Sequence, residues 1–562
     1  MRETSTMKNY IQISSIYFLI HLMIFFPLIS NCEDIKIPSP EIQQKIILKL
    51  SEEMIRLDGE GLLARQGRVE QFQETVNKIA LKTLTNKTVI DFYNSFSQLN
   101  GTYTNLHSHV SFNSQIDSSI KLPFNSNQNI WIIAEADGTS KSKVLIDYIF
   151  DPETEKQVSE GDEIVAINKR PIKDWLDENF LFCKYPLKTQ CDRQFEQNLL
   201  SYVLSWKGEP LYYHVKHLNN IVIVKINFKN SENNNSSFDK KKCDYNYAKR
   251  YPGMKLVHSG IFACIFEDEN SPDIALLRIS SFQYNHKRIP IEVSKEKNIY
   301  SLYDEVNALF PFWQKNSSRY KKLIIDVINN HGGNEPIPYY QILFQHPFQE
   351  QYVRFKKITE LEDPALRAQI FWQTDEIELW FNKLLTSGIW SKLQFGDLTS
   401  PVPMFCVPNN LPCDNFKFTP WDHSFKGDVF VMLNEECISS CDGFVWAIHK
   451  YLNAKLYGFY QAADSAFSRL RINVIWDPKN QNEFKTQVSS FQAEFPENFL
   501  LGQIVANSVA TDENGEVLAG RPLPLYKLVP YKQSQFYPTM VYKTIMNDLL
   551  NNSFINIGDS KR

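Results

Sequence analysis

Apolar residues recur at three- and four-residue intervals in the first part of the chain. After Ser39 and Pro40 this spacing predicts a capped amphipathic helix over residues 41–57. Further helices are predicted over 69–84 and 89–99. The segment that follows the first 32 residues is therefore expected to be helical.

Short apolar runs replace the helical spacing from about residue 130. Residues 130–134 and 144–150 are typical of strands, and residues 161–168 predict a turn that leads into an alternating strand. The polar stretch 229–242 cannot bury a core, so we expect a surface loop or linker there, at a domain boundary.

Strands and helices alternate in the remaining half of the chain. Strands are predicted over 274–279, 323–328, 428–433 and 456–459, and helices over 300–313, 339–344 and 443–452. A repeated order of strand, turn and helix predicts an α/β layer built on a largely parallel sheet.

Composition narrows the class of protein. The 562 residues are 43% hydrophobic and 22% charged, which is enough apolar material for two or three domains. The formal net charge is −4 and the sequence pI is about 6.3. Nucleic-acid binding needs a clustered basic surface, so the sequence argues against that class of partner.

The first 32 residues have the pattern of a secretory signal. Two basic residues, Arg2 and Lys8, precede a nearly apolar run over 16–29, and the segment ends at Ser30-Asn31-Cys32. A retained signal anchor is the alternative, although the run is short for a span and contains His21 and Pro27. We predict a secreted protein without stable membrane insertion.

Eight cysteines remain if Cys32 leaves with the signal, and an even number in an exported chain favours disulfides. Close spacing suggests the pairs Cys183–Cys191 and Cys406–Cys413, while a zinc site competes weakly because no Cys-x-x-Cys motif occurs. Sequons fit an exported glycoprotein and stand at Asn86, Asn100, Asn234, Asn235, Asn316 and Asn551.

Two strand-to-helix turns combine residues suited to acyl transfer. The first ends in Gly332 and Gly333, and paired glycines after a strand allow backbone N–H groups to converge on an oxyanion. The second places Ser439 and Ser440 between a strand and a helix, where a serine either caps the helix or presents its hydroxyl as a nucleophile.

Together the two turns resemble peptidase family S41, the tail-specific or C-terminal-processing proteases. The run from Leu323 through Asp326 and Asn330 to the glycine pair is similar to one motif of that family, and Val431–Asn434 with Ser439 is similar to its nucleophile segment. The resemblance covers roughly residues 100–540, discontinuously.

This resemblance implies a ClpP/crotonase-like ββα core within an α/β fold. It also implies a PDZ-like module that binds a protein or peptide substrate as an added strand. The expected division is a signal peptide at 1–32, a helical segment at 33–125, the PDZ-like module at 126–228, a linker at 229–250 and the S41-like core at 251–562.

The activating base is expected to be a histidine. Bacterial processing proteases of this family pair the serine with a lysine about two dozen residues later, but 460–471 contains no lysine and Asp464 takes that place. The His-Ser-His segment around His107 and His109 resembles the histidine segment of the branch that includes chlamydial protease-like activity factor and fungal secreted members. Metal binding by these histidines lacks a clear third ligand.

We therefore expect an acyl-enzyme route in which Ser439 attacks and His107, or else His109, takes its proton. The resemblance assigns the oxyanion to the Ser440 amide with Gly332 or Gly333, and no cofactor or metal is required. Glu494, Glu497 and Glu516 are the candidates for the third catalytic residue. The alternative hypothesis is a weakened or inactive homologue that acts as an extracellular binding protein.

Overall fold

The structure is a computed structural model of the whole chain. It describes residues 35–558 apart from positions 60–68, 104, 120–125, 136–141, 196–210, 227, 231–241, 283–301, 334–335, 347, 349–350, 365, 367–383, 387, 404–422, 465–468 and 532–535. The predicted signal segment therefore lies outside the described residues.

A seven-stranded sheet forms the centre of the second half of the chain, in the order β10-β11-β12-β13-β16-β17-β22. The strands from β12 onward run parallel, while β10 and β11 are antiparallel. Their bounds are Met254–Ser259, Ala263–Asp268, Ile274–Ile279, Lys322–Asp326, Asp428–Leu433, Lys455–Gly458 and Lys527–Leu528. The predicted largely parallel layer is confirmed.

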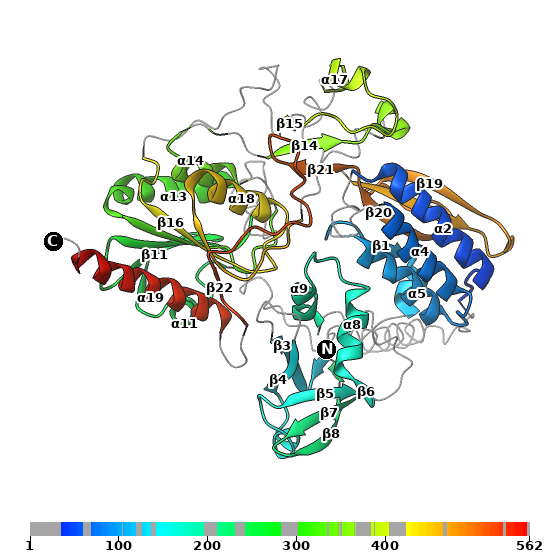
Figure 1. Cartoon of the computed structure of the whole chain (residues 1–562), viewed down its shortest axis with the longest axis horizontal. Helices are drawn as coiled ribbons and strands as arrows, with labels where there is room; N and C mark the ends of the chain where they lie inside the picture. Colours follow the sequence, from blue (N-terminus) through cyan, green and yellow to red (C-terminus); the bar gives the residue numbers. More distant parts are fainter. Residues whose placement is uncertain are drawn as a thin grey trace, which may run out of the picture.

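Helices cover both faces of this sheet (Figure 1). One face packs against α13 (Leu302–Asn316), α14 (Ile337–Leu343) and α18 (Ser440–Leu452). The other packs against α11 (Tyr247–Arg250) and α19 (Tyr537–Gly558). Because both faces are buried, the central strands are continuous apolar runs rather than alternating ones.

The N-terminal helices α2 (Pro40–Leu57), α4 (Val69–Thr83) and α5 (Val89–Ser97) match the predicted segments closely. Ser39 caps α2 by accepting a hydrogen bond from the Ile42 amide. These helices share one apolar core with a second sheet of order β1-β20-β18-β19, which the sequence did not predict. Its strands are Val110–Phe112, Phe499–Ala506, Arg469–Trp476 and Phe484–Ser490.

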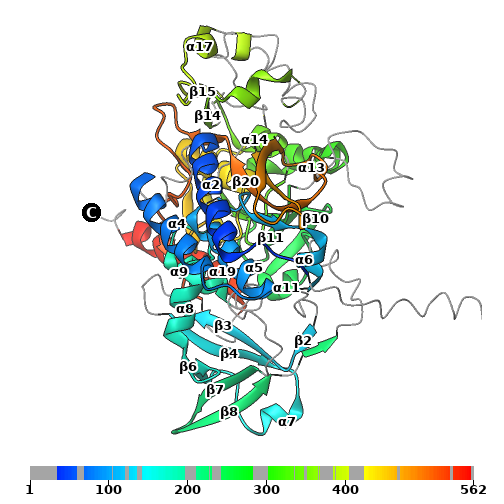
Figure 2. The ribbon, with the colours of Figure 1, turned by 90° about the vertical axis from the view of Figure 1, so that its right-hand side faces the viewer.

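A separate β layer lies on one side of the molecule (Figure 2). Its strand order is β3-β4-β5-β7-β8, with β6 (Arg170–Pro171) paired to β5. The strands are Ile130–Glu135, Lys143–Ile149, Glu163–Ile167, Leu211–His217 and Asn220–Ile226. Helices α8 (Ile172–Phe180) and α9 (Lys188–Arg193) lie between this layer and the rest of the chain in Figures 1 and 2.

The remaining elements join these layers. A small sheet β15-β14-β21 is formed by Val402–Pro403, Tyr352–Phe355 and Ser508–Thr511, and α17 (Gly388–Ser391) lies near it. Short pieces are β2 (Ser126–Gln128) with β9 (Phe228–Asn230), α6 (Ser114–Ser119), α7 (Pro152–Glu155) and three 3₁₀ turns at Gln98–Thr102, Ser317–Arg319 and Thr359–Glu362.

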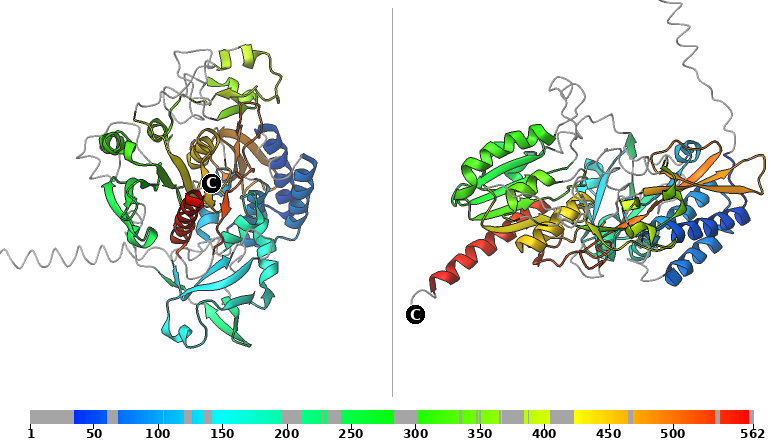
Figure 3. Two further views of the ribbon diagram at one scale, coloured as in Figure 1. Left: turned by 60° about the vertical axis from the view of Figure 1, so that its left-hand side comes forward. Right: turned by 90° about the horizontal axis from the view of Figure 1, so that it is seen from above.

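The last helix, α19, ends far from the N-terminal helices (Figure 3). Among the described residues, no helix is both long and apolar enough to cross a membrane. The whole is a mixed α/β fold with several sheets, as the order of the predicted elements indicated.

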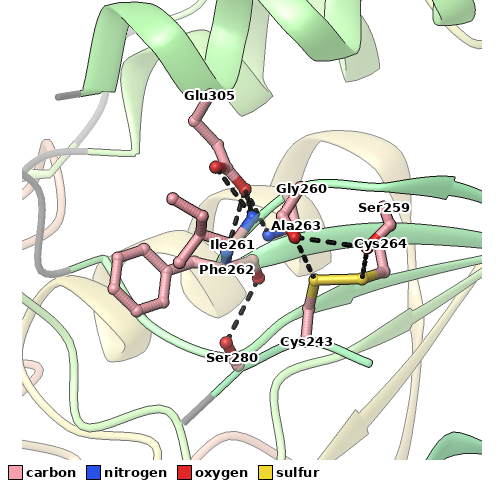
Figure 4. The surroundings of a disulfide bond; sticks show 9 residues. All are labelled: Cys243, Ser259, Gly260, Ile261, Phe262, Ala263, Cys264, Ser280 and Glu305. Carbon is pink, nitrogen blue, oxygen red and sulfur yellow. Dashed lines mark hydrogen bonds between the residues drawn. A yellow bond between two sulfur atoms is a disulfide. The ribbon is translucent and has the colours of Figure 1, made fainter. Parts of the chain in front are cut away.

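Three disulfides link described cysteines: Cys183–Cys191, Cys243–Cys264 and Cys437–Cys441. The first confirms a predicted pair, whereas Cys406 and Cys413 lie outside the described residues. Cys243–Cys264 ties the chain before β10 to β11 (Figure 4). Disulfides of this kind are typical of oxidising compartments.

The hairpin beside Cys264 is held by Glu305 of α13, as Figure 4 shows. The carboxylate accepts hydrogen bonds from three consecutive amides, those of Ile261, Phe262 and Ala263, at 2.6–3.0 Å. Burial nevertheless raises the pKa of this carboxyl, and the three amide hydrogen bonds oppose that rise. The contact fixes helix α13 against the antiparallel edge of the main sheet.

Two of the predicted glycosylation sites are buried. The side-chain amide of Asn86 donates a hydrogen bond to Gln43 Oε1, and Asn100 Oδ1 accepts one from the backbone amide of Val110. A glycan cannot be accommodated on either side chain in this fold. Asn316 is half-buried, and Asn234 and Asn235 lie outside the described residues.

Candidate active site

The glycine turn after β13 lies directly against the serine turn after β16. A Cβ atom on Gly332 would stand 2.3 Å from the Ile438 carbonyl oxygen and 3.0 Å from Ser439 Cβ. Gly332 also has φ +77°, a region that favours glycine. Glycine is therefore required here both for its backbone conformation and for the close approach of the two turns.

The Gly332 amide is already engaged within its own turn. It donates to Asn330 Oδ1 at 2.9 Å, and Asn330 Nδ2 donates to the Ile279 carbonyl. Asp326, at the end of β13, is fully buried and accepts from Arg278 at 2.7 Å. This network fixes the turn and engages the Gly332 amide.

Ser439 stands at the N-terminal end of α18 in an uncommon conformation, with φ 61° and ψ −123°. A non-glycine residue in this region carries backbone strain of about 1–3 kcal/mol, which is often found at functional sites. Its hydroxyl makes no capping hydrogen bond, so the simple capping role considered for it is not observed. The side chain is half-buried rather than enclosed.

Cys437 and Cys441 flank Ser439 and form a disulfide across the turn. Both cysteines are fully buried in the core beneath α18. A covalent link between the two sides of the turn restricts the backbone around Ser439 in a way that hydrogen bonds alone do not.

His107 contacts an acid. Its Nδ1 atom lies 2.8 Å from Asp464 Oδ2, and the Asp464 side chain has no exposed surface whereas that of His107 is 21% exposed. The two atoms are at ion-pair distance, but the contact does not have the geometry of a hydrogen bond, and both atoms are buried without a hydrogen-bond partner among the described residues. A carboxylate beside Nδ1 favours the tautomer in which Nε2 can accept a proton.

Asp442 connects this pair to the serine turn. It lies one helical turn after Ser439, and its carboxylate accepts hydrogen bonds from the Ala463 amide at 3.1 Å and the Asp464 amide at 2.8 Å. Burial raises the pKa of Asp442, an effect that these amide hydrogen bonds oppose. The helix that carries Ser439 therefore holds the segment that carries Asp464.

His109 differs from His107 in its surroundings. Burial, reinforced by the charge of Lys184, lowers the pKa of His109 to about 4. A base with so low a pKa removes a proton from serine poorly near neutral pH, where a pKa close to 7 is favoured. Of the two histidines, His107 is the one that the structure shows in contact with a carboxylate.

The buried neutral state of His109 predicts acid-sensitive stability. Its folded pKa of about 4 lies below the unfolded value near 6.5, so its contribution is complete above pH 6.5 and is lost as the pH falls toward 4. We expect His109→Asn to reduce the fall in unfolding free energy between pH 7 and pH 4 by about 3 kcal/mol. Urea titrations at both pH values measure this fall, and an equal fall in both proteins would contradict the assignment.

The acids considered from sequence lie elsewhere on the surface. Glu494 and Glu497 are exposed, and Glu516 is 70% exposed in a contact with Arg521. None of them has a contact with His107 among those that the structure shows. The sequence had placed Asp464 in the position of the family's lysine, and that replacement was the available signal for its role.

The described residues hold no group of three or more His, Cys, Asp or Glu side chains that could bind a metal ion. The two turns supply a hydroxyl and backbone amides, and the contact between His107 and Asp464 supplies an imidazole and a carboxylate. Such a set supports nucleophilic attack on a carbonyl followed by stabilisation of the resulting oxyanion.

Comparison with known proteins gives one family match. The sequence profile of peptidase family S41 matches residues 273–471, which contain both turns and Asp464. No curated protein sequence shows significant similarity to this chain.

The fold is similar to that of solved structures. A crystal structure of mature CPAF has a TM-score of 0.58 at 14% identity, covering 91% of this chain and 96% of that one. Mature CPAF complexed with lactacystin gives 0.59 at 13% identity, with 92% and 99% covered. A photosystem II D1 C-terminal processing protease covers 90% and 98% at 9% identity, with a TM-score of only 0.34. At these identities the likeness to CPAF establishes the fold alone.

Proposed function

Because residues 273–471 match the profile of peptidase family S41, we propose that this chain is a serine endopeptidase that works through an acyl-enzyme on Ser439. His107 is the general base in this proposal, and Asp464 orients it. The observation that carries the proposal is the 2.8 Å contact between His107 and the fully buried Asp464, joined through Asp442 to the helix that carries Ser439.

The reaction follows from these positions. Ser439 Oγ attacks the carbonyl carbon of the scissile bond while His107 Nε2 takes the hydroxyl proton, and the carbonyl oxygen becomes an oxyanion. The Gly333 and Ser440 amides stabilise that oxygen. His107 then donates the proton to the leaving amine, and water, activated by the same imidazole, releases the acyl group.

The finer description of the fold belongs to this proposal. We regard the seven-stranded layer as the ClpP/crotonase-like core and the sheet of 126–228 as a PDZ-like module that binds an extended protein or peptide. Secretion through a signal at 1–32 is supported by the disulfides, since such bonds form in oxidising compartments. A glycan on Asn316 is compatible with its partial exposure.

The alternative of an inactive binding protein rested on the missing lysine and on the lack of an acid for the histidine. Asp464 supplies such an acid at Nδ1 of His107. This contact supports catalysis over the alternative.

Hydrolysis of fluorescently labelled casein by the secreted protein tests the proposal. We expect Ser439→Ala to lower the rate by at least about 10⁴-fold, because removal of the nucleophile leaves only binding and oxyanion stabilisation. Ser118→Ala, on an exposed short helix, is the matched control and should retain the wild-type rate. Equal rates for wild-type and Ser439→Ala proteins would rule Ser439 out as the nucleophile.

A further inference from the structure

The loop closed by the Cys183–Cys191 disulfide contacts the three segments that carry His107, Ser439 and Asp464. We call it the 183–191 loop. Its cysteines and Tyr185 pack with Ala462, two residues before Asp464, and with Leu106 and Ile438, which directly precede His107 and Ser439. Since the loop follows α8, a part of the chain far from the family match contributes to the site.

Two polar side chains of the 183–191 loop bind the backbone of these segments. Gln190 Nε2 donates to the carbonyls of Tyr460 at 3.1 Å and Gln461 at 2.7 Å. Lys184 Nζ donates to the Leu106 carbonyl at 2.7 Å. The ammonium therefore holds the peptide group immediately before His107.

We propose that Lys184 is a positioning residue for the reaction at Ser439: its ammonium group holds the backbone that carries His107. This inference rests on the proposed function, because it assigns Lys184 a part in the same reaction. In this role Lys184 does not touch the substrate carbonyl but acts through His107 and Asp464.

The charged groups around Lys184 determine the direction in which loss of its charge should shift the pH dependence of the rate. Burial lowers the pKa of Lys184 to about 8, and the Asp464 charge opposes that change. Arg469 of β18 also interacts with Asp464, and its pKa is lowered by burial to about 10. His107, His109, Asp442 and Tyr185 are further titratable groups in this neighbourhood. Two cations therefore interact with the Asp464 carboxylate.

Loss of one cation should stabilise the protonated imidazole of His107. The acidic limb of kcat/KM against pH reports the pKa of the free enzyme's base, so this limb should move to higher pH in a variant without the Lys184 charge. A side chain that served only to support the loop would lower stability without moving the limb.

The test measures casein hydrolysis from pH 5 to 9 for wild-type, Lys184→Met, Lys184→Gln and Lys184→Arg proteins. We expect Lys184→Met to lower kcat/KM by about 10- to 100-fold, mainly through kcat, and to move the acidic limb upward by about half a pH unit or more. Lys184→Gln keeps a donor for Leu106 without the charge, so it should show the same shift with a smaller loss of rate. Lys184→Arg should retain most of the wild-type rate and leave the acidic limb close to its wild-type position.

Lys188→Met is the matched control, because Lys188 lies in the same loop but pairs with Asp177 and Asp192 instead. It should leave the acidic limb where it is in the wild type. If wild-type hydrolysis depends on Ser439 but the acidic limb does not move in the Lys184 variants, the positioning role alone is overturned. Loss of Ser439 dependence in the wild type would overturn the proposed function and this role with it. If Lys184→Met proves to be unfolded in a thermal scan, the position of the acidic limb in Lys184→Gln decides whether the positioning role holds.

Discussion

Replacing Asp464 by asparagine is expected to lower kcat by about 10³- to 10⁴-fold while KM changes little. Asparagine has the same shape, but its amide cannot stabilise the imidazolium that forms when His107 takes the serine proton. It can also hold the ring in the wrong tautomer. Because Asp464 is fully buried and 2.8 Å from His107 Nδ1, solvent cannot replace the lost carboxylate.

Carboxylate-to-amide changes at exposed acids provide the control for Asp464→Asn. Glu494→Gln, Glu497→Gln and Glu516→Gln remove the acids that the sequence had suggested as third members, and each should retain the wild-type kcat. Steady-state kinetics with a quenched fluorescent peptide measures all four variants. If one glutamate variant loses most of its kcat while Asp464→Asn stays active, that glutamate, and not Asp464, orients the imidazole.

Replacing Gly332 by alanine is expected to lower kcat/KM by at least about 100-fold, because misplacement of a reacting group by roughly 1 Å has an effect of that size. The new methyl group would lie 2.3 Å from the Ile438 carbonyl oxygen and 3.0 Å from Ser439 Cβ. The serine turn must therefore move. Kinetic measurement combined with thermal unfolding separates the loss of activity from the loss of stability.

Gly253 offers a matched control, since it has φ +87° but no atom lies within 4 Å of the place that a Cβ would take. Gly253→Ala should cost about 1 kcal/mol of unfolding free energy through its backbone conformation and leave kcat/KM unchanged. If Gly332→Ala loses no more activity than Gly253→Ala, the close contact of the two turns does not control the position of Ser439.

Local patterns in the sequence predicted most of the helices and strands. Strand β16 follows the predicted range of 428–433, and α2 begins after Ser39 as its capping pattern indicates. These elements follow from periodicity and caps, which are properties of neighbouring residues. The two turns were also recognisable, because glycine pairs and a serine between strand and helix are local signals.

The parts that the sequence did not predict depend on contacts between distant segments. Strands β18 to β20 form their sheet with β1, more than 350 residues away, under helices from the N-terminus. Asp464 was visible as a replacement for lysine, but its contact with His107 joins residues 357 positions apart. Similarly, Lys184 gave no signal, since a single lysine near a cysteine does not indicate which backbone it will bind.

Mass spectrometry of the protein after reaction with a fluorophosphonate probe tests the central claim most directly. The claim predicts one adduct, on the peptide that contains Ser439, with labelling slowed strongly in His107→Ala and in Asp464→Asn. An adduct on another serine, or equal labelling rates in wild-type, His107→Ala and Asp464→Asn proteins, would contradict a serine activated by His107 and Asp464.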